Sequence, residues 1–276
     1  VYGKPMIYYP LATLMLSGIR EIAIVSTPSD IPLYKKLLGT GDYLGLKFTY
    51  IVQEKPKGIA DVFTISSKFI DKDNVMLILG DNIFHGNMRL NTIKSEFKKG
   101  CLIFGYSVNN PSSYGVVELN SSGEIIDLVE KPKKPKSNLA IPGLYLYDNE
   151  VIKIANSILP SERGELEITD VNREYLRKDQ LKVQILGRGI SWMDAGTVEG
   201  LHHISSLIKS IEGNQKYQIA CLEEIALRMN FIDLESYGVL IEKIPNSPYR
   251  DYLLAIKEEV ESFTKEGIEK LKDFQP

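Results

Sequence analysis

Two aspartates stand where a chemical site could form. The apolar run Leu77–Leu79 is followed by Gly80 and then Asp81, and a second apolar segment, Ile190–Met193, leads into Asp194. We interpret both segments as strands whose carboxyl ends carry the acid, at the sheet edge where α/β proteins bind ligands. Two carboxylates brought together there could hold one hard cation over a phosphate substrate. The pair indicates metal-dependent phosphoryl chemistry, although each aspartate alone is as typical of a turn or helix cap.

Other polar residues suit the binding of a nucleotide or a sugar. Gln53 follows a predicted strand, and its amide offers a donor and an acceptor to a base edge. Gly58 opens a predicted helix, whose first free amides could bind a phosphate or a base. Glu130–Lys131 could bind hydroxyls and phosphate, and Tyr114–Gly115 could pack on a sugar. Each also has a plain structural interpretation, since exposed loop glutamines, helix-opening glycines and Tyr-Gly turns are common.

The order of the predicted elements indicates an α/β fold. Strands and helices alternate over residues 6–106, which favours right-handed βαβ units and a Rossmann-like mixed, mainly parallel sheet flanked by helices. The turn at Ser121–Gly123 predicts an antiparallel hairpin, and residues 139–147 predict one further strand. Only helices are expected after Gly213. We therefore predict a catalytic domain over residues 1–212 and a small helical C-terminal region over residues 213–276.

Composition narrows the class of protein. The 276 residues carry a formal net charge of −3, which favours neither a nucleic-acid partner nor a polybasic membrane surface. No apolar segment is long enough to suggest a membrane span. The two cysteines, Cys101 and Cys221, have no disulfide or metal-ligand spacing, which fits a reducing cytoplasm. We expect a cytoplasmic protein with small-molecule substrates.

Several ordered segments together resemble one enzyme family along essentially the whole chain. These segments are Lys4–Leu11, Leu79–Asn82, Tyr114–Glu118, Glu130–Pro132, Gly164–Asn172 and Trp192–Thr197. They resemble the sugar-1-phosphate nucleotidylyltransferases. So many matches in one order are far more specific than a single loop motif.

The resemblance implies a role for each candidate residue. Asp81 and Asp194 would hold Mg²⁺, and Gln53 and Gly58 would meet a thymine or uracil base. Lys131 would contact the sugar phosphate. The residues expected to line the glucosyl site are Tyr114, Gly115, Glu130, Gly143 and Trp192.

The implied reaction joins dTTP and glucose 1-phosphate into dTDP-glucose and releases pyrophosphate. The attacking phosphate oxygen is already ionised at neutral pH, so no general base is needed. Catalysis then consists of holding two anions together and offsetting charge at the α-phosphate.

Alternatives stay open at this point. UTP or another hexose 1-phosphate is possible, because one methyl group in an apolar pocket is worth only about 1–3 kcal/mol. A nucleotide-sugar binding protein without turnover and a nucleotide-sugar-dependent glycosyltransferase are the other classes. Lys131 and Gly164–Asn172 fit the nucleotidylyltransferase pattern better than that of a glycosyltransferase.

One family feature is not found in this sequence. The family has a strand and a Gly-Gly-x-Gly-Thr-Arg loop ahead of the segment that corresponds to Lys4–Pro5, and this loop cradles the triphosphate. We therefore expect the chain, taken as these 276 residues, to be a poor catalyst.

The C-terminal part resembles the second nucleotide site through which the end product inhibits some family members. The residues concerned are Gly187, Arg188, Ile219, Ala220, Cys221, Glu224, Ile225 and Arg228. Gly86–Asn91 departs from the family pattern there, since it lacks the expected histidine and acidic residue. A helix that merely packs in the core explains residues 221–228 equally well. The resemblance also implies a homotetramer.

Overall fold

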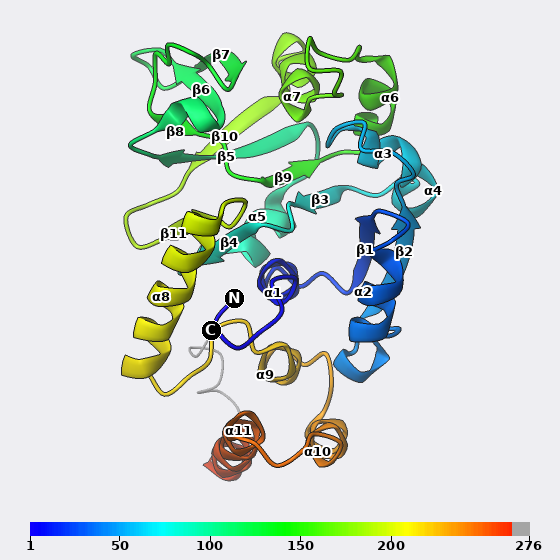
Figure 1. Cartoon of the computed structure of the whole chain (residues 1–276), viewed down its shortest axis with the longest axis vertical. Coiled ribbons are helices and arrows are strands. Elements are labelled where there is room, and N and C mark those ends of the chain that lie inside the picture. The colour runs from blue at the N-terminus through cyan, green and yellow to red at the C-terminus, as the bar shows by residue number, and fades with distance from the viewer. Residues whose placement is uncertain (267–276) are drawn as a thin grey trace.

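The computed structural model describes residues 1–266, which build a central sheet with helices around it (Figure 1). The helices differ in how they begin: the side chains of Thr197 and Asp233 cap two of them, whereas most of the others described have no side-chain cap. They are α1 (Tyr8–Leu16), α2 (Ile31–Leu38), α3 (Asp61–Ile65), α4 (Ser67–Ile70), α5 (Leu90–Glu96), α6 (Glu150–Ser157), α7 (Ile168–Arg177), α8 (Val198–Asn214), α9 (Leu222–Arg228), α10 (Leu234–Glu242) and α11 (Pro248–Glu266), with short 3₁₀ turns η1 (Asp42–Leu44) and η2 (Pro111–Ser113).

The strands form three hydrogen-bonded groups. They are β1 (Glu21–Ser26), β2 (Lys47–Val52), β3 (Val75–Ile78), β4 (Asn82–His85), β5 (Cys101–Ser107), β6 (Gly115–Leu119), β7 (Ile125–Glu130), β8 (Leu139–Ala140), β9 (Leu144–Tyr147), β10 (Leu181–Ile185) and β11 (Ser191–Asp194). The largest group runs in the order β3-β9-β5-β8-β6-β7, with β10 paired to β5. β1 pairs with β2, and β4 with β11.

The predicted α/β class with helices around a central sheet is confirmed, but the expected predominance of parallel pairs is wrong. Within residues 1–266 only β1–β2 and β5–β10 are parallel. β9 runs antiparallel to both β3 and β5, between which it lies. Hydrophobic runs predict that strands exist, whereas their direction depends on how later segments return through the sheet.

Several boundaries also differ from the sequence prediction. The strand expected over residues 139–147 is two strands, because Pro142 and Gly143 interrupt the ladder between β8 and β9. The helix expected to start at Gly58 starts only at Asp61 and is divided into α3 and α4 at Ser66. β4 was not predicted, whereas α10 falls in the region after Gly213 where only helices were expected. β4 follows Asp81 directly, with no turn residues between the acid and the strand.

The C-terminal helices share a core with the N-terminal half. One buried cluster joins Leu11 and Met15 of α1, Ile24 of β1, and Leu222 and Ile225 of α9. Figure 1 shows α9 directly beneath α1, with α10 and α11 beyond it. α8 continues to Asn214, so the predicted boundary after residue 212 falls in its last turn. The last part of the predicted C-terminal region, residues 267–276, lies outside the described residues.

None of the helices in the described part of the chain is both long and apolar enough to cross a membrane.

Candidate active site

Asp81 and Asp194 lie together at the ends of two paired segments. β11 pairs with β4 so that Asp194 is opposite Asn82, and the N–H of Ala195 donates to the carbonyl of Asp81 at 2.8 Å. A β-carbon placed on Gly196 would lie 3.0 Å from Oδ1 of Asp194 and 3.3 Å from Oδ2 of Asp81. The two carboxylates therefore converge on one small volume, which only glycine leaves open.

Each of these carboxylates is fixed by one hydrogen bond and keeps one oxygen available. Oδ1 of Asp81 accepts from the Asn82 amide at 2.8 Å, and Oδ1 of Asp194 accepts from the N–H of Gly196 at 2.8 Å. No described residue donates a hydrogen bond to Oδ2 of either aspartate. The Oδ2 oxygens and the remaining lone pairs of the Oδ1 oxygens are available to a cation.

The donor set fits Mg²⁺ held jointly with a substrate. Among residues 1–266, no cluster of three His, Cys, Asp or Glu side chains forms a metal cage. Mg²⁺ commonly binds through one or two carboxylates and completes its shell with water and substrate phosphates. Asp81 and Asp194 supply that number of protein ligands.

The residues expected to line a sugar site gather beside the aspartates. The ring of Trp192 meets that of Tyr114 edge-to-face, with centroids 4.9 Å apart. Gly115 lies opposite Glu130 in the β6–β7 pair, and a β-carbon on Gly115 would lie 3.2 Å from Oε2 of Glu130. Gly143 is buried against Leu79, whose side chain would be 2.6 Å from a β-carbon there. The five predicted residues therefore do lie in one region.

Lys131 follows Glu130 with a positive φ of 40°. Its N–H donates to the carbonyl of Tyr114 at 3.1 Å, which holds this conformation at the end of the hairpin. The side chain is exposed, and no described residue forms an ion pair with it. An exposed lysine with no such partner, at the end of the hairpin next to Glu130, is suited to bind an anionic group of a ligand.

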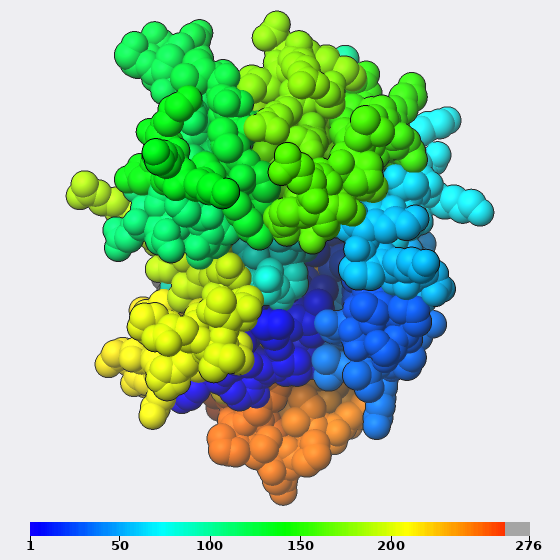
Figure 2. Space-filling model, turned by 45° about the horizontal axis from the view of Figure 1, so that its top comes forward, coloured from blue at the N-terminus to red at the C-terminus, as the bar shows by residue number. Residues whose placement is uncertain are grey.

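Gln53 and Gly58 line one cavity of about 520 Å³. Its walls come mainly from β1 and β3, each of which pairs with one other strand in the described chain, and from α3, α4, Gly80 and the loop after β2. Figure 2 shows this side of the molecule hollowed between its green upper part and its blue lower part. A β-carbon on Gly58, where φ is +105°, would collide with the backbone of Leu166 at 2.5 Å. The glycine is therefore required for the close contact between this loop and the segment before α7.

Burial and the nearby carboxylates raise the pKa of two tyrosines around the site. Burial raises the pKa of Tyr114, and the charge of Asp194 raises it further. Burial also raises the pKa of Tyr145, with smaller contributions from Glu130, Cys101 and Asp81. Both hydroxyls keep their protons at neutral pH and can act as hydrogen-bond donors.

The residues of the predicted second nucleotide site lie around α9 and the loop before β11. Arg228 donates to Glu224 at 2.8 Å and to Glu259 at 2.9 Å, while Cys221 is fully buried. Arg188 is exposed in the loop.

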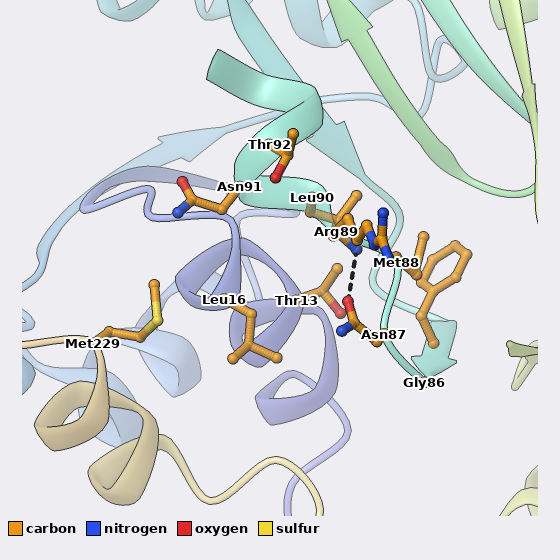
Figure 3. Close-up of a pocket in the computed structure, with 11 residues that line it drawn as sticks. Thr13, Leu16, Gly86, Asn87, Met88, Arg89, Leu90, Asn91, Thr92 and Met229 are labelled. Carbon is orange, nitrogen blue, oxygen red and sulfur yellow. Dashed lines mark hydrogen bonds between the residues drawn. The ribbon is translucent and has the colours of Figure 1, made fainter. Parts of the chain in front are cut away.

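A small cavity of about 110 Å³ opens near these residues, between α1 and the Gly86–Thr92 segment (Figure 3). Thr13, Leu16 and Met229 line this cavity. Within the part of the chain that the structure describes, none of the predicted regulatory residues lines it. Met229 is the immediate neighbour of Arg228. A regulatory role for residues 187–188 and 219–228 stays a prediction.

A family model described as nucleotidyl transferase matches residues 1–210. The chain belongs to this nucleotidyl transferase family. It is 46% identical over 258 residues to a glucose-1-phosphate thymidylyltransferase of Neisseria meningitidis, covering 93% of this chain and 90% of that protein. It is 45% identical to the glucose-1-phosphate thymidylyltransferase of Mycolicibacterium smegmatis, covering 93% and 89%. The resemblance drawn from the motif segments is confirmed.

Solved structures show the same fold. One from Bacillus anthracis, described as a glucose-1-phosphate thymidylyltransferase in complex with sucrose, superposes with a TM-score of 0.68 at 37% identity, covering 74% of this chain and 82% of that one. A UDP-glucose pyrophosphorylase complexed with UDP-glucose gives a TM-score of 0.64 at 23% identity, covering 77% and 88%. This second likeness concerns the fold alone.

Three polar residues of this nucleotidyl transferase were given no role by the sequence. The Asn82 amide accepts from the N–H of Gly143 at 2.8 Å and from Trp192 Nε1 at 2.7 Å. Thr169 donates to Glu130 at 2.5 Å, and Asp61 accepts from Gln53 at 3.0 Å. Asn82 adjoins Asp81 in the motif, which could have drawn attention to it. Thr169 is 39 residues from Glu130, and Asp61 is separated from Gln53 by the loop before α3, so neither pairing has a signal in the sequence.

Proposed function

We propose that this chain transfers a nucleotidyl group from dTTP to glucose 1-phosphate, giving dTDP-glucose and pyrophosphate. The main observation that supports the proposal is that Asp81 and Asp194 converge beside the cavity lined by Gln53 and Gly58. Relatives named glucose-1-phosphate thymidylyltransferase, at 44–46% identity over nearly the whole chain, support the choice of nucleotide and sugar.

We assign the binding of sugar, sugar phosphate and base to three groups of residues. Tyr114, Trp192 and Glu130 orient the sugar, with the Glu130 carboxylate accepting from hydroxyl groups. Lys131 reaches the sugar phosphate and, as a cation, holds its oxygen near the nucleotide. Gln53 and Gly58 bind the base and so place the α-phosphate at the aspartates.

The reacting oxygen belongs to a phosphate that is ionised at neutral pH, so the protein needs no base to activate it. Its main task is to bring two anions into line and to offset the charge that develops in transfer. Asp81 and Asp194 would hold Mg²⁺, which when bound neutralises phosphate charge. We propose further that the chain works in the cytoplasm as a homo-oligomer, in deoxysugar or cell-surface polysaccharide synthesis.

The direct test measures pyrophosphate release from dTTP or UTP with glucose 1-phosphate and Mg²⁺, with EDTA as the control. It uses this chain and a version extended at its N-terminus by the family's glycine-rich segment. We expect metal-dependent release with dTTP preferred. Equal or better use of UTP, or of another hexose 1-phosphate, would replace the substrate assignment. Binding of dTDP-glucose without release by either version would instead support a binding protein.

A further inference from the structure

The amide of Gln53 is held by a buried carboxylate. Gln53 follows β2, and its Nε2 lies 3.0 Å from Oδ2 of Asp61, the first residue of α3. Asp61 is only 7% exposed. The carbonyl of Gly58 is a second, more distant acceptor for the same nitrogen, at 3.5 Å. Both groups around Nε2 therefore accept hydrogen bonds, and neither can donate one.

This surrounding decides which way the amide faces. The oxygen and nitrogen of a carboxamide are similar in shape, so only the partners distinguish its two orientations. An ionised carboxylate accepts and cannot donate, so the orientation that places Oε1 against Asp61 would set two acceptors against each other. Nε2 is thereby committed to Asp61 and Gly58. Oε1 receives no hydrogen bond from any described residue, and Gln53 lines the large cavity.

The group that Gln53 offers a ligand is thus an acceptor. Thymine and uracil carry a hydrogen on ring N3 and can donate it to Oε1. Cytosine has a lone pair at N3 and would face Oε1 with a second acceptor. A site built around one hydrogen bond discriminates strongly against a ligand that leaves it unmade. The three pyrimidines are nearly equal in size, so shape alone cannot make this distinction.

We propose that Asp61 is a positioning residue that sets base choice by fixing the orientation of the Gln53 amide. The proposal rests on the nucleotidyl transfer proposed above and adds the residue that selects thymine or uracil over cytosine. It does not concern the choice between dTTP and UTP, whose bases present the same N3–H.

The test is the substitution Asp61→Asn, which keeps the size of the side chain and adds a donor. The introduced amide can donate to Oε1 of Gln53, which frees Nε2 to turn into the cavity and meet N3 of cytosine. The matched control is Glu54→Gln, which removes one negative charge from the exposed residue beside Gln53 without touching its amide. Affinities for dTTP and dCTP are measured by calorimetry for the unchanged chain and both variants.

We expect the unchanged chain to prefer dTTP over dCTP by about 10²-fold or more. Asp61→Asn should lower this ratio at least about tenfold, while Glu54→Gln keeps it. A variant that is merely less stable would lose affinity for both nucleotides and leave the ratio unchanged. Because the asparagine oxygen could still accept from Nε2, Asp61→Leu, which cannot accept, is measured alongside, and a dTTP preference that neither substitution alters overturns the role of Asp61 alone. Failure of both the unchanged chain and the version extended by the glycine-rich segment to bind either nucleotide overturns the proposed function, and this inference with it.

Discussion

Asn82 connects the aspartate and sugar sides of the site through one carboxamide. It is 4% exposed, and its nitrogen donates to Asp81. Its oxygen accepts from Gly143 and Trp192, at 2.8 and 2.7 Å. Asn82 therefore aligns a metal-facing carboxylate, the backbone beneath the sugar site and the aromatic ring on its wall.

Replacing Asn82 by Ala should destabilise the fold as well as the site. The N–H of Gly143 and Nε1 of Trp192 would lose their acceptor while buried, at about 1–3 kcal/mol for each unsatisfied donor. We expect the free energy of unfolding in urea to fall by about 2–4 kcal/mol. Asn87→Ala, in an exposed loop, is the control and should change it by less than about 0.5 kcal/mol. Equal stability of the two variants would contradict this role.

At the scale of single residues, the sequence predicted the two aspartates of the site but not the residues that hydrogen-bond to the other site residues. Asp81 and Asp194 could be found because each follows a recognisable apolar run. Asp61 and Thr169 could not, since their importance depends on the hydrogen bonds they make to Gln53 and Glu130 after folding. The convergence of the two acids also depends on the β4–β11 pairing, and β4 had no separate signal in the sequence.

The β4–β11 pair is the element that brings the two aspartates together, and His85 ends its first strand opposite Ser191. Burial lowers the pKa of His85 below its ordinary value. The folded state therefore binds fewer protons at His85 than the unfolded state does, once the pH falls below about 6.5. The stability that the neutral imidazole contributes is complete above that pH and is lost as the pH falls towards the lowered folded pKa.

His85→Gln removes this titration from the strand. We expect the melting temperature of the unchanged chain to fall between pH 7.5 and pH 5.5, and the variant to show a smaller fall over the same window. His202→Gln, in an exposed part of α8, controls for the loss of any histidine. Identical pH dependence of the unchanged chain and His85→Gln would show that His85 does not couple folding to protonation.

Elements were predictable where a periodic apolar pattern was bounded by turn residues. The β6–β7 hairpin closes around the predicted turn at Ser121–Gly123, and β9 ends at Tyr147, where the predicted strand ends. Strand direction was not predictable, because the antiparallel course of β9 between β3 and β5 is a property of the whole sheet.

At the scale of the whole molecule, one buried ion pair ties the N-terminal segment to α8. Nζ of Lys4 lies 3.1 Å from Oε1 of Glu212, and their side chains are 6% and 12% exposed. The same Glu212 oxygen accepts from the N–H of Ile219 at 2.9 Å. The start of the chain, the end of α8 and the approach to α9 therefore meet at one carboxylate.

Glu212→Gln would leave the Lys4 ammonium buried without a counter-charge. Breaking a buried pair in this way costs about 3–5 kcal/mol, which we expect as a loss in the free energy of unfolding. The exposed pair Lys47–Glu21, with side chains 71% and 67% exposed, supplies the control, and Glu21→Gln should cost less than about 1 kcal/mol. If the unpaired Lys4 ammonium causes the loss, the double variant Lys4→Met/Glu212→Leu should recover most of it. Equal losses in Glu212→Gln and Glu21→Gln would exclude this cause.

The central claim is that Asp81 and Asp194 serve one metal ion in nucleotidyl transfer. The most direct measurement compares Mg²⁺-dependent pyrophosphate release by Asp81→Asn, Asp194→Asn and the double variant, in whichever form of the chain is active. If both aspartates hold the same ion, each single change should lower the rate by about 10²-fold or more, and the double variant should lose little beyond the larger single effect. A single variant with an unchanged rate, or a double variant whose loss is the product of the two, would contradict the claim.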